Sequence, residues 1–157
     1  MQKFLRILII IAIAALAVSQ FFQPERNTSP VTSSHLFEME QIPENIQSIL
    51  KNSCFDCHSN QTRYLWYHQI SPVSWMVNRH ITEGKKELNF SEWGKLDDFS
   101  KIGHLEEICR EAELKKMPLK AYTAMHPKAR LNEEQIASLC AWTETMGEKL
   151  LTKNLKE

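Results

Sequence analysis

The five residues from Cys54 to His58 are those whose types and spacing most clearly indicate chemistry. They read Cys-Phe-Asp-Cys-His, the C-x-x-C-H pattern of covalent haem attachment. Two thiols three positions apart can each add to one vinyl group of the same porphyrin, and the adjacent imidazole is then held under the iron as an axial ligand. The pattern therefore predicts one covalent haem c, bound by Cys54, Cys57 and His58.

Three other uses of this cysteine pair fit the sequence less well. A structural zinc site needs a second close pair of cysteines, but Cys109 and Cys140 lie far apart. A thioredoxin-like redox pair follows a strand in a βαβ setting, whereas residues with helical spacing precede Cys54. A disulfide within the pair would close so short a loop that it would constrain little. Haem attachment is therefore the favoured interpretation.

Met117 is the residue that we expect to bind the iron as its second axial ligand. Pro118 disfavours helical geometry at the residue before it, so a loop should carry the Met117 thioether. His80 and His126 are the alternative ligands. His80 could also be a buried, hydrogen-bonded side chain or a propionate partner, and His126 could simply fix a loop. The expected metal ligands are thus His58 and Met117.

An aromatic segment comes soon after the attachment motif. We expect its residues to pack against the porphyrin and to hydrogen-bond the haem propionates. Ordinary core packing is the alternative for any one of them. The residues concerned are Arg63, Tyr64, Trp66 and Tyr67. The second ring nitrogen of His58 needs an acceptor that orients the imidazole, and the carbonyl of Ser71 or Pro72 is a candidate. The remaining histidines are expected to be solvated, namely His35, His68 and His104.

Apolar residues recur at helical spacing in four segments, and no segment alternates like a strand. The expected helices cover about residues 42–53, 71–84, 99–116 and 132–150. Ser71 should cap the second helix, Pro118 should stop the third, and Asn132 with Gln135 should form a capping box for the fourth. Cys109 and Cys140 fall on the apolar faces of the last two helices. They could form a disulfide or serve as small buried hydrophobic residues.

The N-terminal residues predict export. Lys3 and Arg6 precede an apolar run that extends to Phe22, so residues 1–22 are a signal anchor or a cleavable signal peptide. The positive charges on the short side place the rest of the chain outside the cytoplasmic membrane, on its periplasmic side. Residues 23–41 are rich in Pro, Ser, Thr and Asn and are expected to be a linker. The haem-binding domain is then expected to cover residues 42–157.

Charge argues against one class of partner. Lys and Arg total 19 and Asp and Glu total 19, with no long run of one sign. The electrostatic surface of a nucleic-acid binder is therefore missing. Expected partners are the membrane, through the N-terminal segment, and redox proteins.

The whole set of residues resembles the bacterial haem-binding domain family of small, N-terminally anchored monohaem c-type cytochromes. The resemblance rests on Gln20, Pro24, Glu25, Arg26 and Asn27; on Cys57, His58, Ser59 and Asn60; on Tyr64, Trp66, Tyr67, Ile70, Pro72 and Trp75; on His80, Gly84, Leu88, Asn89, Phe90, Ser91 and Trp93; and on Met117, Pro118, Tyr122, His126 and Ala129. It implies haem c binding by a cytochrome c-like, all-α domain of about four helices. It offers no role for Cys109 and Cys140.

An electron carrier is the favoured function, with a His/Met-ligated haem in a small helical shell. The protein is then an electron-transfer protein rather than an enzyme. The alternatives are a membrane-tethered haem sensor or interaction module and a peroxidase-like haem enzyme with an open iron position.

Overall fold

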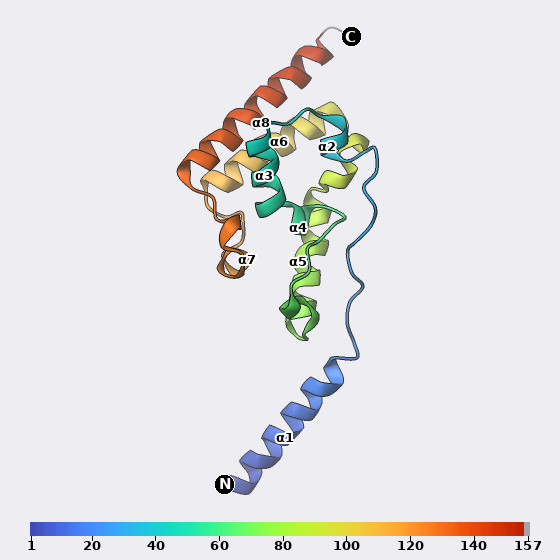
Figure 1. Ribbon diagram of the computed structural model, residues 1–157, viewed down its shortest axis with the longest axis vertical. Helices are drawn as coiled ribbons and strands as arrows, with labels where there is room; N and C mark the ends of the chain where they lie inside the picture. The colour runs from blue at the N-terminus through green and yellow to red at the C-terminus, as the bar shows by residue number, and fades with distance from the viewer. Residues whose placement is uncertain (156–157) are drawn as a thin grey trace.

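Helices make up the regular structure of the computed structural model, which describes residues 1–155 (Figure 1). The α-helices are α1 (Gln2–Ser19), α2 (Leu36–Met39), α3 (Glu44–Ser53), α4 (Phe55–His58), α5 (Val73–Glu87), α6 (Asp98–Glu113), α7 (Lys120–Met125) and α8 (Glu133–Asn154). The 3-10 helices are η1 (Trp66–Gln69), η2 (Phe90–Lys95) and η3 (Pro127–Ala129). Within residues 1–155 there is no strand, only an isolated bridge between Thr28 and Gln61. The prediction of an all-α fold is confirmed.

The four expected helices correspond to α3, α5, α6 and α8. The capping box of α8 is present, because Asn132 Oδ1 accepts from the Gln135 amide and Gln135 Oε1 accepts from the Asn132 amide. The expected ends of α5 and α6 were wrong by a few residues. Ser71 lies before α5 instead of capping it, and α6 ends at Glu113, before Pro118. The other α-helices inside the domain span only four to six residues, too few for a periodic pattern to show.

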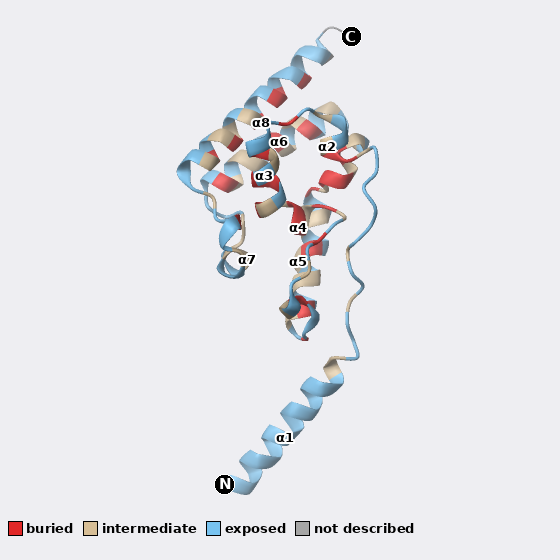
Figure 2. Cartoon of the chain, viewed as in Figure 1, coloured by how far each residue is buried: buried red, intermediate tan, exposed pale blue. Residues whose placement is uncertain are grey.

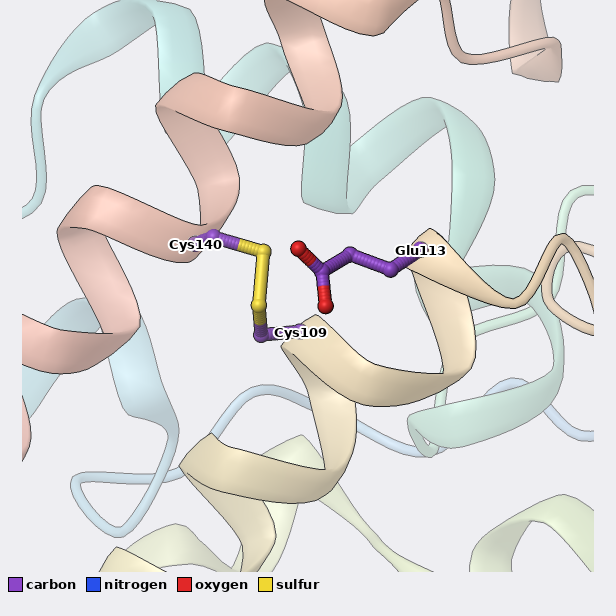
Figure 3. Close-up of side chains that lie close together, drawn as sticks. All are labelled: Cys109, Glu113 and Cys140. Atoms are coloured by element: carbon purple, nitrogen blue, oxygen red, sulfur yellow. A yellow bond between two sulfur atoms is a disulfide. The ribbon is translucent and has the colours of Figure 1, made fainter.

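Helices α6 and α8 pack along each other and carry much of the core (Figure 1). A disulfide between Cys109 and Cys140 joins them, with the Glu113 carboxylate beside it (Figure 3). The sequence left open whether these cysteines pair, and the structure pairs them. The disulfide closes a loop of 31 residues and fixes two helices that line the same large cavity.

The segment expected to be a linker packs partly into the domain. His35 and Leu36 are buried, at 6% and 0% exposed, and Leu36 belongs to the same core cluster as Ile46 and Leu50 (Figure 2). The Ser34 carbonyl accepts a hydrogen bond from the Gly94 amide. The packed part of the chain therefore begins several residues before the expected boundary at residue 42. The sequence pattern did not predict the short helix α2, because polar residues flank it on both sides.

Helix α1 extends away from the domain and is exposed along its length (Figures 1 and 2). Its mean hydropathy is 2.0 over 18 residues, and it is the one helix among residues 1–155 that is long and apolar enough to cross a membrane. Length and composition of this kind suit a membrane span and equally a signal sequence.

Candidate haem-binding site

The attachment motif directly follows α3 and forms the single turn of the short helix α4. Helix α3 ends at Ser53 with Cys54 as its C-cap, and the Cys54 carbonyl accepts hydrogen bonds from the amides of Cys57 (3.2 Å) and His58 (2.9 Å). These bonds begin the short helix α4 and place the three motif residues on one turn. Both thiols are free and partly buried. The local structure therefore presents two thiols and an imidazole together, as the sequence pattern requires.

The environment keeps these thiols protonated. Burial, and then the proximity of Cys57, raises the pKa of Cys54 to about 12. Burial, and then the charge of Asp56, raises the pKa of Cys57 to about 11. Thioredoxin-like and other reactive cysteines have lowered pKa values instead. The chemistry of the site thus argues against a thiolate redox pair.

The imidazole of His58 is held by the end of α5. Its Nδ1 lies 3.1 Å from the Leu88 carbonyl oxygen, and since a carbonyl can only accept, Nδ1 carries the proton. Nε2 is then left for a metal. Burial lowers the pKa of His58, although the backbone carbonyls of Leu88 and Gly84 oppose the shift. The neutral ring, which is the form that binds iron, is therefore favoured.

The expected orienting carbonyl of Ser71 or Pro72 was wrong. The C-terminal end of α5, not its start, packs against α4. Gly84 lies against Cys57, and Leu88 caps the same helix with a carbonyl that is free to accept.

An apolar cavity of about 710 Å³ adjoins the attachment turn, and Cys54, Cys57 and His58 line it. Its apolar lining comes from several helices and includes Val77, Ile81, Leu88, Phe90, Ile108, Ala112, Leu119, Leu131 and Leu139. Cofactor sites typically enclose roughly 300–1,000 Å³ and have mostly apolar walls with a few placed polar groups. Two free thiols, an oriented imidazole and this lining fit a covalently attached haem.

Met117 lies on the loop between α6 and α7, as expected, and lines this cavity. It is 40% exposed, and its amide donates to the Glu111 carbonyl. His80, on α5, lines the same cavity and has no side-chain hydrogen bond among the described residues. His126 also lines it, but His126 Nδ1 bonds to the Tyr122 carbonyl at 3.0 Å. The structure therefore brings Met117 and both alternative ligands to one cavity.

The aromatic segment contributes less to the cavity than expected. Tyr67 lines it, whereas Arg63, Tyr64 and Trp66 do not. Arg63 pairs with Asp56 at 3.1 Å, and the Tyr64 hydroxyl accepts from the Asn27 amide. Trp66 is 72% exposed. Local polar partners thus hold Arg63 and Tyr64 away from the expected haem contact.

Several residues of the site carried no clear signal in the sequence. Asp56, at 4% exposed, accepts from the Tyr122 hydroxyl (2.7 Å) and from Arg63, so it braces the attachment turn from behind. Burial is the main cause that raises the pKa of Tyr122, which keeps its hydroxyl a donor. His68 was expected to be solvated but is 7% exposed and lines the cavity, and His104 is half-buried there. The spacing of these residues follows no short motif, so only the fold shows their roles.

Comparison with known proteins agrees with the site. A family model described as Haem-binding domain matches residues 14–145. No curated protein and no solved structure matches the chain. The match covers most of the sequence, from within α1 into α8, and includes the attachment turn and every helix that lines the cavity. The chain belongs to the haem-binding domain family.

Proposed function

We propose that this protein is a monohaem c-type cytochrome that carries single electrons. Cys54 and Cys57 hold the haem through thioether bonds, and His58 and Met117 are its axial ligands. The observation that carries the proposal is the placement of two free thiols and an oriented imidazole on one turn, lining an apolar cavity of about 710 Å³.

When bound, the haem supplies an iron that gains or loses one electron. The residues of this chain provide the setting. The Leu88 carbonyl fixes the orientation of the His58 ring. The apolar walls exclude water, and the Met117 thioether favours ferrous iron more than a second imidazole would. Preformed walls limit the rearrangement that accompanies electron transfer.

The proposed location is the periplasmic side of the cytoplasmic membrane. Helix α1 is suited to an anchor, with Lys3 and Arg6 on its cytoplasmic end. The Cys109–Cys140 disulfide supports the same compartment, since disulfides persist in oxidising surroundings. The proposed partners are other redox proteins, and the N-terminal segment contacts the membrane.

One observation favours a second candidate, a peroxidase-like enzyme. The rings of His68 and His126 stack with centroids 5.8 Å apart, and both residues line the cavity. An imidazole there could serve as an acid or base for a ligand bound to iron. That function, like a tethered haem sensor, requires an iron position open to small molecules.

Two measurements on the full chain, produced together with a haem c maturation system, test the proposal. Acid-acetone extraction followed by intact-mass analysis should show one haem that remains covalently bound. Carbon monoxide added to the ferrous protein should bind slowly or not at all, because both axial positions are filled. Rapid binding would favour the enzyme or sensor, and an extractable haem would contradict the c-type assignment.

A further inference from the structure

The end of α1 is hydrogen-bonded to the domain. Gln20 Nε2 donates to the Ser71 carbonyl (3.2 Å), and Gln20 Oε1 accepts from the Ser71 amide (3.0 Å). The Ser71 hydroxyl donates to the Ser19 carbonyl, and Trp75 Nε1 donates to the Phe22 carbonyl at 2.7 Å. Ser71 is fully buried by these contacts and its own neighbours. These hydrogen bonds therefore join the end of the apolar helix to the residues at the start of α5.

Exposed apolar side chains gather in the segments next to this junction. Trp66 is 72% exposed on η1, and Trp75 is 44% exposed at the start of α5. The other exposed apolar residues of these segments that do not line the haem cavity are Phe21, Phe22, Leu65 and Ile70. Apolar side chains grouped in this way on a soluble surface usually mark an interaction site. Tryptophan is the residue type that collects at the boundary between lipid and water.

The length of α1 determines how deep this surface lies relative to the bilayer. Its 18 residues span about 27 Å at roughly 1.5 Å per residue, close to the hydrocarbon thickness of a bilayer at about 30 Å. Ser19 and Gln20 then lie where the chain leaves the hydrocarbon region. Because Ser71 is bonded to both, the start of α5 must lie at the same depth.

We infer that the surface formed by Leu65, Trp66, Ile70 and Trp75 rests in the headgroup region of the same bilayer that α1 enters. This inference rests on the proposed anchoring of the chain by α1. The Gln20–Ser71 pair fixes the angle of the domain to the membrane, and the exposed tryptophans hold it there. Trp66 also contacts Tyr67, with ring centroids 5.8 Å apart, and Tyr67 lines the haem cavity. In this orientation the Trp66 ring lies between the lipid surface and Tyr67, which forms part of the cavity wall.

Hydroxyl-radical footprinting of the haem-loaded full chain in phospholipid nanodiscs tests the inference. Phe99 is the matched control, because it is also 72% exposed. It lies at the start of α6, where Asp98 pairs with Lys153 near the end of α8, far from α1 (Figure 1). The oxidation rate of each residue is divided by its rate in the unfolded chain. Trp66 should be protected several-fold more than Phe99.

A variant at the Gln20–Ser71 contact tests whether this contact orients the domain on the membrane. Gln20→Ala removes both bonds to the Ser71 backbone, so protection of Trp66 should fall while the haem absorption spectrum stays unchanged. Gln41→Ala, at an exposed glutamine with no side-chain hydrogen bond among the described residues, should leave the protection as it was. A disc-bound chain in which Trp66 reacts as fast as Phe99 would overturn the inference and leave the haem assignment intact. A chain that does not stay with the discs would overturn the anchoring on which it rests.

Discussion

Gly84 lies so close to Cys57 that a Cβ added to it would meet the Cys57 carbonyl oxygen at 2.8 Å and the Cys57 Cβ at 3.3 Å. The backbone of α5 therefore packs directly on the turn that carries the attachment motif. Leu88 is the C-cap of the same helix, and its carbonyl orients His58. One helix thus determines the positions of both the Cys57 thiol and the His58 imidazole, and only glycine allows it to come this close.

Gly84→Ala should destabilise the protein, because the methyl group meets backbone atoms that cannot move aside cheaply. We expect a loss of about 1–3 kcal/mol in the free energy of unfolding, typical of overpacking, and a lower yield of covalent haem. Thermal and denaturant unfolding of the haem-loaded protein measure the first, and absorbance per chain measures the second.

Gly103→Ala is the matched control, because it lies in helix α6 with nothing within 4 Å of its added Cβ. It should be neutral or stabilising by up to about 1 kcal/mol, as alanine replaces glycine in a helix. Equal stability changes in the two variants would show that the contact with Cys57 does not matter.

Covalent haem should depend on both thiols of the motif. Cys54→Ala and Cys57→Ala should each lower the covalently bound haem, since one thioether bond remains, and the double variant should lose it entirely. Acid-acetone extraction followed by intact-mass analysis measures the bound fraction. Covalent haem retained in full by the double variant would refute the attachment site.

The disulfide should stabilise the fold without being needed for haem. It closes a 31-residue loop, for which chain entropy gives about 3–4 kcal/mol. Replacing both Cys109 and Cys140 by serine should therefore lower the free energy of unfolding by about 2–4 kcal/mol while haem remains attached. Alkylation of the unmodified chain under denaturing, non-reducing conditions should label neither residue. Labelling of both would exclude the bridge.

The buried His35 should make stability depend on pH. Burial lowers its pKa, and its Nδ1 accepts from the Phe37 amide, which requires the neutral ring. The unfolded chain then binds a proton more readily than the folded one, so this contribution is complete above about pH 6.5 and is lost as pH falls through the lowered pKa. His35→Asn keeps an acceptor at the start of α2 but cannot titrate.

Unfolding free energies at about pH 7.5 and about pH 5.5, on either side of the ordinary histidine pKa, test this contribution. The difference between the two values should be smaller for His35→Asn than for the parent chain. The comparison of variants removes the effects of other titrating groups. Parallel pH profiles would show that His35 does not contribute.

The sequence predicts those parts of the molecule that depend on local spacing. The helical fold, the capping box at Asn132 and the attachment turn follow from residues that are neighbours along the chain or along one helix. The acceptor for His58 was predicted at the wrong end of α5, because that choice depends on how two helices pack. The burial of His35 and the placement of Arg63 against Asp56 also depend on contacts that no periodic pattern records.

The last prediction concerns the proposed second ligand of the iron, for which Met117 is the candidate and His80 the main alternative. Met117 and His80 both line the cavity, and a thioether favours ferrous iron more than an imidazole does. Met117→Ala should therefore lower the reduction potential by a fraction of the roughly 0.8 V range that axial ligands span. It should also open the iron to carbon monoxide and remove the weak red-edge band of ferric Met-ligated haem. Met125→Ala, at another exposed methionine of the same cavity, should change none of these. If the band survives Met117→Ala while His80→Ala opens the iron, the ligand is His80.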